Sequence, residues 1–379
     1  MIITKLRNDP IQIIDQNIYH GQSLDLLMCG HRSQPSIGNR TLGPLTYGQR
    51  LSIAHNWLQG RYRETEYFHH CKMFPTKLHL ERELFYLTHA GYMRVHNRLR
   101  NEPLQRRYQT EIATHTKTDI ADFVKKGDTI FAGRGCGSCY IYEHDVIHEQ
   151  RLHSPKEYLL CVTFANELFV TSTDRCSKVW QRANEFDLVH LDLLQEFKHS
   201  YKALQFQSGG DRFYGGLYTD LDRHALREHD LESGAHSILN SNSISIYDLK
   251  LKDDQVVFTA NFDTTFRMYD RRSNQDEAIW EDPFDSSFYC LDYDGLYGVL
   301  CGTKYHGRVN LYDIRVPGKY VQLYFPYGTR QNSSPVYSIA CDSRYLFVAT
   351  DHDVRAFDFK ADCAVSRDYR DIFKETKRF

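Results

Sequence analysis

Arg308-Val309-Asn310-Leu311-Tyr312-Asp313 is the stretch that decides the fold, because its ending recurs along the chain. Five more segments end in an aromatic residue or a histidine, most with an acid beside it: Ile141-Tyr142-Glu143, Val179-Trp180, Glu228-His229-Asp230, Met268-Tyr269-Asp270 and Ala356-Phe357-Asp358. The steps from Tyr142 to Phe357 are 38, 49, 40, 43 and 45 residues, and a weaker copy, Arg94-Val95-His96, lies 46 residues earlier. A period of about forty residues ending in a Trp-Asp-like pair is typical of a β-propeller blade. The sequence therefore predicts an all-β fold, a seven-bladed WD-repeat β-propeller.

Composition agrees with a soluble β-protein. Of the 379 residues, 41% are hydrophobic and 25% are charged, and 26 Tyr and 22 Phe stand against 5 Met, which favours strands. The net charge of −2 gives no reason to expect nucleic acid or an anionic membrane as partner. The ten cysteines lack a regular spacing, and no apolar run approaches the roughly 18 residues that span a bilayer. We expect reduced thiols and a cytoplasmic location, with the nucleus as a second compartment.

Three regions are expected along the chain. Residues 1–61 form a partly helical N-terminal segment, with a helix over Gln49–Leu58 because its apolar residues recur at helical spacing. Residues 62–360 form the propeller, whose first complete blade runs from about Lys77 to Thr114. Residues 361–379 form a charged C-terminal tail.

The pattern within the blades also predicts how the ring closes. In the clearest blade, three strands can be read at Phe288–Tyr293, Leu296–Gly302 and Arg308–Tyr312. The last repeat, Ser334–Lys360, supplies only three strands, so we expect Arg63–Cys71 to add the outer strand of the last blade and remove an exposed edge. An independent N-terminal hairpin is the alternative.

Turns between strands supply the candidate binding residues. Asp174 and Asp263 each lie six residues before the terminal aromatic, and a turn aspartate that accepts backbone N–H bonds is expected to be structural. Neighbouring loop positions should face solvent at one rim of the ring. The residues expected to contact a partner protein there are Arg134, Arg175, Phe262, Lys304, Tyr305 and His306.

Other motifs resemble chemical sites without the context those sites need. Cys136-Gly137-Ser138-Cys139 lies in a β-turn with no helix to lower the thiol pKa, and no second Cys-x-x-Cys could complete a zinc site. Adjacent residues of His69-His70-Cys71 would point to opposite faces of a strand. The arginines of Arg94–Arg107 are not interleaved with aromatics as in an RNA-binding motif. We assign no catalytic, cofactor-binding or metal-ligating residue, and an enzymatic propeller is the least favoured reading.

Three stretches resemble the F-box and WD-repeat proteins. They are Gln49–Glu64, Asp263–Asp270 and the segment from Ser287 through Asp313 to Phe359, and the resemblance covers residues 48–360. It implies a substrate receptor of an SCF-type ubiquitin ligase, promoting ubiquitin-dependent degradation. The F-box would bind the adaptor subunit on the cullin, and the propeller face would hold the protein substrate.

The N-terminal part departs from that family pattern. Residues 1–47 contain neither the Leu-Pro pair that opens an F-box nor a Trp, and Leu24–Met28 corresponds to what remains of its final helix. A truncated and a divergent F-box are both compatible with this sequence. The alternative function is a WD-repeat scaffold in another complex, with no ubiquitin role.

Overall fold

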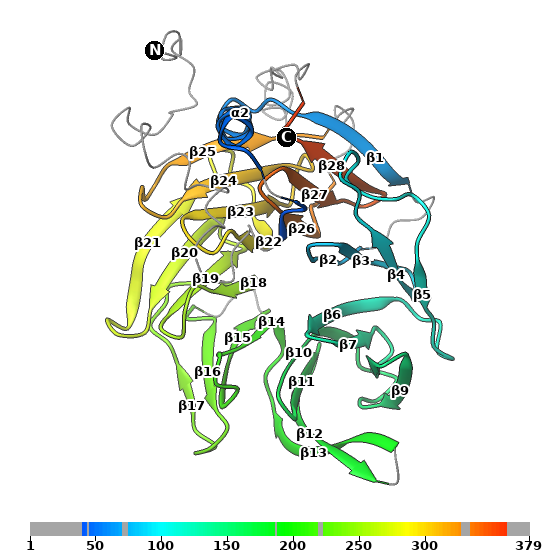
Figure 1. Ribbon diagram of the computed structural model, residues 1–379. Coiled ribbons are helices and arrows are strands. Elements are labelled where there is room, and N and C mark those ends of the chain that lie inside the picture. Colours follow the sequence, from blue (N-terminus) through cyan, green and yellow to red (C-terminus); the bar gives the residue numbers. More distant parts are fainter. Residues whose placement is uncertain are drawn as a thin grey trace.

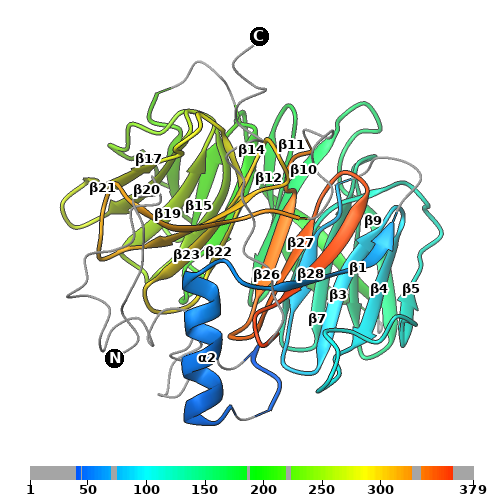
Figure 2. The ribbon, with the colours of Figure 1, turned by 90° about the horizontal axis from the view of Figure 1, so that it is seen from above.

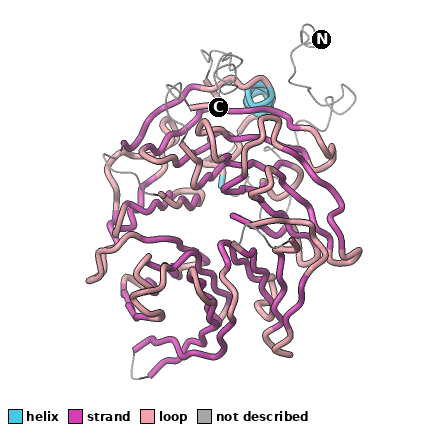
Figure 3. The backbone as a smooth tube through the Cα atoms, turned by 180° about the vertical axis from the view of Figure 1, so that it is seen from behind, coloured by secondary structure: helices cyan, strands magenta, loops and turns pink. Residues whose placement is uncertain are grey.

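A computed structural model shows seven four-stranded antiparallel sheets arranged as blades around a central axis (Figure 1). The structure describes residues 40–43, 45–69, 75–185, 188–218, 223–326 and 334–361. The first strand of each blade lies nearest the axis, and the backbone trace is dominated by strands (Figure 3). This arrangement confirms the predicted seven-bladed all-β propeller. In the described part of the chain, no helix is long and apolar enough to cross a membrane.

Each blade takes its strands in sequence order, except the last. The first four blades are β2 Leu78–Leu80, β3 Leu84–His89, β4 Tyr92–Asn97 and β5 Thr110–Ile112; β6 Ile120–Lys126, β7 Thr129–Arg134, β8 Ser138–Glu143 and β9 Val146–Arg151; β10 Leu159–Ala165, β11 Leu168–Thr173, β12 Ser177–Glu185 and β13 Leu188–Phe197; β14 Tyr201–Phe206, β15 Arg212–Leu217, β16 Leu226–Asp230 and β17 His236–Ile238. The other three are β18 Ile246–Leu251, β19 Val256–Asn261, β20 Thr265–Asp270 and β21 Gln275–Glu281; β22 Phe288–Tyr293, β23 Gly298–Thr303, β24 Val309–Asp313 and β25 Tyr320–Tyr324; and β26 Ser338–Cys341, β27 Tyr345–Ala349, β28 Asp353–Asp358 and β1 Arg63–His69.

The recurring aromatic residue has the same place in every blade. It lies in the third strand, and all copies from His96 to Phe357 obey this rule, including the two that carry histidine. Tyr269 and Tyr312 are fully buried, as is His229 to within 1%. The repeat therefore marks a core position, where an aromatic ring fills the space between two neighbouring sheets.

The N-terminal strand closes the ring. β1 pairs antiparallel with β28, from Arg63 opposite Asp358 to His69 opposite Asp353. Arg355 reinforces the pairing, with Nη1 donating to Glu64 Oε1 at 2.6 Å and Nη2 donating to Glu66 Oε2 at 2.7 Å. The expected outer strand of the last blade is thus confirmed over its described residues, and the independent hairpin is wrong. His70 and Cys71 lie outside the described residues.

Aspartates of the inner strands join one blade to the next. The Oδ2 atom of Asp122 accepts the backbone N–H of Val162 at 3.1 Å, and that of Asp248 accepts the N–H of Leu291 at 2.7 Å. Each bond crosses from the first strand of one blade to the first strand of its neighbour. A buried carboxylate that accepts a backbone N–H satisfies both groups, so these bonds fix the spacing of blades near the axis.

A single helix in the described chain, α2 (Tyr47–Leu58), lies against the last two blades (Figure 2). It begins two residues before the predicted Gln49 because Thr46 caps it: Thr46 Oγ1 accepts the N–H of Gln49, and Gln49 Oε1 accepts the N–H of Thr46. Trp57 stacks on Phe359 with ring centroids 3.5 Å apart, and its Nε1–H donates to the carbonyl oxygen of Ser343 at 3.0 Å. The helix is therefore bound to the propeller by both packing and directed hydrogen bonds.

The long 49-residue step corresponds to an elongated hairpin in the third blade. β12 and β13 contain 9 and 10 residues, against 6 and 7 for the matching strands of the fifth blade. Leu193 and Leu194 of β13 are about half exposed. The extra residues of this hairpin thus extend the outer edge of the third blade. The turn between β15 and β16 of the fourth blade, residues 218–225, is also longer than the matching turn 262–264, and its residues 219–222 lie outside the described chain.

Candidate functional site

The turns that carry the predicted partner residues meet on one face of the ring. We define this entry face as the end where first strands begin and second strands end. Phe262 directly follows β19, Lys304-Tyr305-His306 directly follow β23, and Asp174-Arg175 directly follow β11. Equivalent strands of all blades run in the same direction, so these turns share one face although their blades differ.

Lys304 brings three of the predicted residues together. Its Nζ lies 5.7 Å from the ring centroid of Phe262 and 5.3 Å from that of Tyr305, both within the range of cation–π attraction. The ring of His306 follows at 6.4 Å from Tyr305. Burial lowers the pKa of His306, with Arg308 adding to the effect, so this imidazole is neutral at pH 7. The site is therefore a cation held over two aromatic rings.

The backbone beneath these side chains is fixed by short polar bonds. Ser287 Oγ donates to the carbonyl oxygen of Phe262 at 2.7 Å, and the N–H of Lys304 donates to the carbonyl oxygen of Ser287 at 2.9 Å. Ser286 Oγ accepts the N–H of Tyr305 at 3.2 Å. The turns of the fifth and sixth blades are thus held against each other, which orders the rings before any partner arrives.

Four tyrosines that sequence reasoning missed extend this site across the entry face. Tyr247 and Tyr289 stack at 4.6 Å with 11° between their planes; Tyr218 lies 5.6 Å and Phe262 6.2 Å from Tyr247, and Tyr337 lies 6.2 Å from Tyr289. We call these five residues together with Tyr305 the aromatic arc. Tyr218 and Tyr305 are 42% and 41% exposed, and the others are partly exposed. The arc runs over the fourth to the seventh blade.

A bulge in the first strand explains why Tyr247 and Tyr289 reach the entry face. The pairing of β18 with β19 shifts between Ile246 and Asp248, and that of β22 with β23 shifts between Phe288 and Cys290. The extra residue at each shift is a tyrosine, 247 or 289, and a bulge turns such a residue out of the regular alternation. An apolar residue followed by Tyr at the start of the first strand, as in Ile246-Tyr247 and Phe288-Tyr289, was the signal that could have found them.

Tyr289 and Tyr337 keep their hydroxyl protons at physiological pH. Burial raises the pKa of Tyr289, and burial together with Asp351 raises the pKa of Tyr337. The arc therefore offers apolar ring surface edged by hydroxyl groups that donate and accept hydrogen bonds, the combination that makes Tyr common at protein interfaces.

Arg134 does not lie at the solvent-exposed rim where the sequence placed it. Its side chain is fully buried, with Nη2 donating to Thr114 Oγ1 at 2.7 Å and the guanidinium 5.4 Å from the ring centroid of Tyr140. Arg134 is still the last residue of β7, paired opposite Ile120, so the turn to solvent begins only after it. The expected solvent-facing position is therefore wrong, and Arg134 stabilises the packing of the second blade.

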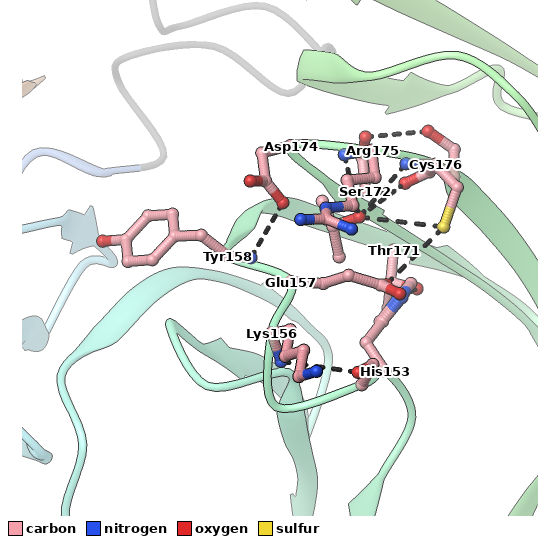
Figure 4. Close-up of polar contacts among 12 residues, drawn as sticks. His153, Lys156, Glu157, Tyr158, Thr171, Ser172, Asp174, Arg175 and Cys176 are labelled. Carbon is pink, nitrogen blue, oxygen red and sulfur yellow. Dashed lines mark hydrogen bonds and ion pairs between the residues drawn. The ribbon is translucent and has the colours of Figure 1, made fainter.

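The turn aspartates make the bonds expected of structural residues. Asp174 Oδ1 accepts the N–H of Tyr158 at 2.9 Å (Figure 4). Asp263 accepts from Thr265 Oγ1 at 2.6 Å and from Arg267 Nη2 at 2.8 Å. Asp174 thus ties its turn to the loop before β10, and Asp263 is held by residues of its own turn and of β20.

Three cations of the entry face form no ion pair within the described chain. Lys304 and Arg175 are two, and Lys202 is the third, with its Nζ 5.8 Å from the ring centroid of Tyr218. Burial beside Lys77 lowers the pKa of Lys202. Arginines elsewhere in the blades are mostly paired; Arg308 and Asp282 are an example with both side chains fully buried. The entry face thus combines aromatic surface with unpaired positive charge.

The motifs set aside as structural have structural surroundings. Cys139 is buried, and burial together with Cys136 raises its pKa, which opposes redox reactivity. His69 Nδ1 lies 2.6 Å from Asp353 Oδ1. Within the arginine-rich stretch, Arg94 pairs with Glu111, and buried Arg98 pairs with an aspartate of the last blade, Asp342.

Comparison with known proteins supports the propeller fold and a relationship to WD-repeat proteins. No protein-family model matches the chain. A human protein described as F-box/WD repeat-containing protein 4 is 25% identical over 335 residues, which cover 86% of this chain and 80% of that protein. The mouse protein of the same description is 24% identical over 334 residues, with the same coverage. This similarity supports a relationship to the WD-repeat proteins and a role in protein interaction.

Proposed function

We propose that this chain is a substrate-recognition subunit of an SCF-type ubiquitin ligase, and that it holds its target protein on the entry face. The observation that carries the binding role is the aromatic arc with its three unpaired cations, Arg175, Lys202 and Lys304. Rings that are ordered beforehand lose little entropy on binding, and unpaired cations attract an oppositely charged partner surface. The ubiquitin role is supported by the described relatives, which carry an F-box in their names.

The proposal divides the chain into two working parts. Residues 1–61 would bind the adaptor and cullin, 62–360 would bind the target, and 361–379 would form a tail, in a protein of the cytoplasm and the nucleus. Of the first part, residues 1–39, which include Leu24–Met28, lie outside the described chain. Catalysis would reside in other subunits, so no catalytic residue is assigned.

Co-purification tests the ubiquitin role. The full chain, expressed at native level with an affinity tag, should recover the adaptor and cullin in stoichiometric amounts. A Lys304→Glu variant serves as the matched control, because its change lies on the propeller and should leave adaptor recovery unchanged while reducing other partners. Recovery of partners without adaptor or cullin would favour the scaffold alternative, in which the same face serves another complex.

A further inference from the structure

Three metal-binding side chain types meet in the third blade, outside the aromatic arc. His153 and Glu157 come from the loop before β10, and Cys176 comes from the turn after β11 (Figure 4). His153 Nδ1 lies 3.1 Å from Glu157 Oε2, and Cys176 Sγ lies 3.7 Å from the same oxygen. All three ligand atoms lie within 4.8 Å of one another.

Backbone bonds hold the two loops in this arrangement. The N–H of Asp174 donates to the carbonyl oxygen of Tyr158 at 2.9 Å, and Asp174 Oδ1 accepts the N–H of Tyr158 in return. Thr173 Oγ1 accepts the N–H of Cys176 at 3.2 Å. The backbone of the two turns therefore holds the three ligand atoms in place, as a preformed metal site requires.

Hydrogen bonding orients the imidazole. Trp180 Nε1–H can only donate, and it donates to Thr171 Oγ1 at 2.8 Å, while Thr171 Oγ1 lies 2.7 Å from His153 Nε2. The Thr171 proton is thus available for Nε2, which leaves the His153 proton on Nδ1, directed at Glu157. In metal-ligating histidines, one ring nitrogen binds the metal and the other usually lies within hydrogen-bonding distance of an oxygen atom.

We propose that His153 Nδ1, Glu157 and Cys176 Sγ form a zinc-binding site. Zinc bonds of about 2.3 Å to sulfur and about 2.0 Å to nitrogen and oxygen place tetrahedral ligand atoms about 3.3 Å apart for N and O and about 3.6 Å apart for S and O. The observed separations are 3.1 and 3.7 Å. A zinc ion would need only small side-chain movements, and water would take the fourth position.

Local charge favours a cation here over the other cluster of this kind. Glu157 forms no ion pair with Lys or Arg in the described chain. In the second cluster, Glu66, His69 and Asp353, the guanidinium of Arg355 already donates to both carboxylates and takes the place of a metal. The Glu157 side chain is 18% exposed against 0% for His153, so the carboxylate edge is the path of entry.

Binding of zinc would release one proton. The Cys176 thiol loses its proton to solvent, and the His153 proton moves from Nδ1 to Nε2, where Thr171 becomes the acceptor. Thiolate and carboxylate then balance the two charges of the ion. Protons compete with zinc for the thiolate, so binding should weaken as pH falls.

Cobalt substitution tests the proposal on the purified full chain. Co²⁺ added to reduced, metal-free protein should give a thiolate-to-cobalt charge-transfer band with tetrahedral visible absorption, at one equivalent per chain, and Zn²⁺ should abolish it. Cys176→Ser should remove the band, and Glu157→Gln should weaken binding at least about 10-fold. The matched control is Cys136→Ser, which changes the partly exposed cysteine of the corresponding turn in the second blade and should leave the band intact.

Each contrary result is decisive. No charge-transfer band in the wild-type chain would show that the cluster is held by hydrogen bonds alone. A band that survives Cys176→Ser would place the metal on other cysteines. The wild-type titration alone can refute the proposal, so the test remains valid even if a variant fails to fold. The site lies on the entry face beside Arg175 and outside the aromatic arc. The cobalt titration uses the purified chain without any partner, so its outcome does not depend on the ubiquitin role.

Discussion

Trp57→Ala should release α2 from the propeller while leaving the blades folded. Trp57 is 2% exposed, stacks on Phe359 at 3.5 Å, meets Tyr324 edge-on at 5.3 Å and donates to the Ser343 carbonyl. Truncating a buried tryptophan costs about 3–5 kcal/mol, and an isolated helix of about 12 residues is marginal in water. The contact free energy lost therefore exceeds the stability that α2 has as an isolated helix, and the helix should detach locally.

Hydrogen exchange followed by mass spectrometry measures this effect. A loss of about 3 kcal/mol corresponds to more than about 100-fold faster exchange in α2 peptides, whereas β26 and β27 should keep their protection. Leu51→Ala is the matched control, because Leu51 lies on the same helix and is 43% exposed, so its truncation should cost under about 0.5 kcal/mol. Equal exchange in the two variants would refute the reasoning that the Trp57 contacts bind the helix.

The other predictions concern charge. Lys304→Glu should weaken target binding at least about 10-fold, or about 1.4 kcal/mol, by calorimetry or pull-down, with the melting temperature nearly unchanged; a large stability loss would contradict a surface role. Asp282→Ala should destabilise the chain by about 3–5 kcal/mol in urea unfolding, because it removes the carboxylate that pairs with the buried Arg308 at 2.5 Å. Asp270→Ala, which breaks a pair whose Arg272 side chain is 69% exposed, should cost under about 1 kcal/mol, and similar losses in the two variants would contradict this reasoning. Burial lowers the pKa of His229 to about 3, so below pH 6.5 the unfolded chain binds this proton and the folded chain does not. Stability should thus fall by about 1.4 kcal/mol per pH unit from this group, and His229→Phe should show a shallower acid slope in pH-dependent unfolding than wild type; identical slopes would count against it.

The repeat predicted the fold well because it records a packing constraint. A ring such as Tyr312 is needed once per blade, in the third strand, so its period gives both the number of blades and their order. Closure was predictable for the same reason, since a blade short of one strand must find it elsewhere. The helix start was not, because Thr46 acts through a cap outside the apolar pattern.

The candidate site was only partly predictable. Turn position identified Phe262, Lys304 and Tyr305, because residues after a second strand lie on the entry face whatever their type. The same rule failed at Arg134, where the strand runs one residue further and the side chain stays inside. Tyr247 and Tyr289 were missed because a bulge is a change in pairing register, and register depends on the partner strand.

The helix α2 and the aromatic arc lie at opposite ends of the blades. Trp57 donates to Ser343, which lies in the turn between β26 and β27, where the first strand ends and the second begins. That turn is at the opposite end of the blade from the entry face. A module carried on α2 would therefore leave the aromatic arc uncovered, and the Trp57 contacts would fix its orientation relative to a bound target. If the chain acts in a ubiquitin ligase as we propose, Trp57→Ala should impair transfer of ubiquitin to the target more than binding of the target. Binding and transfer assays on one preparation can separate the two.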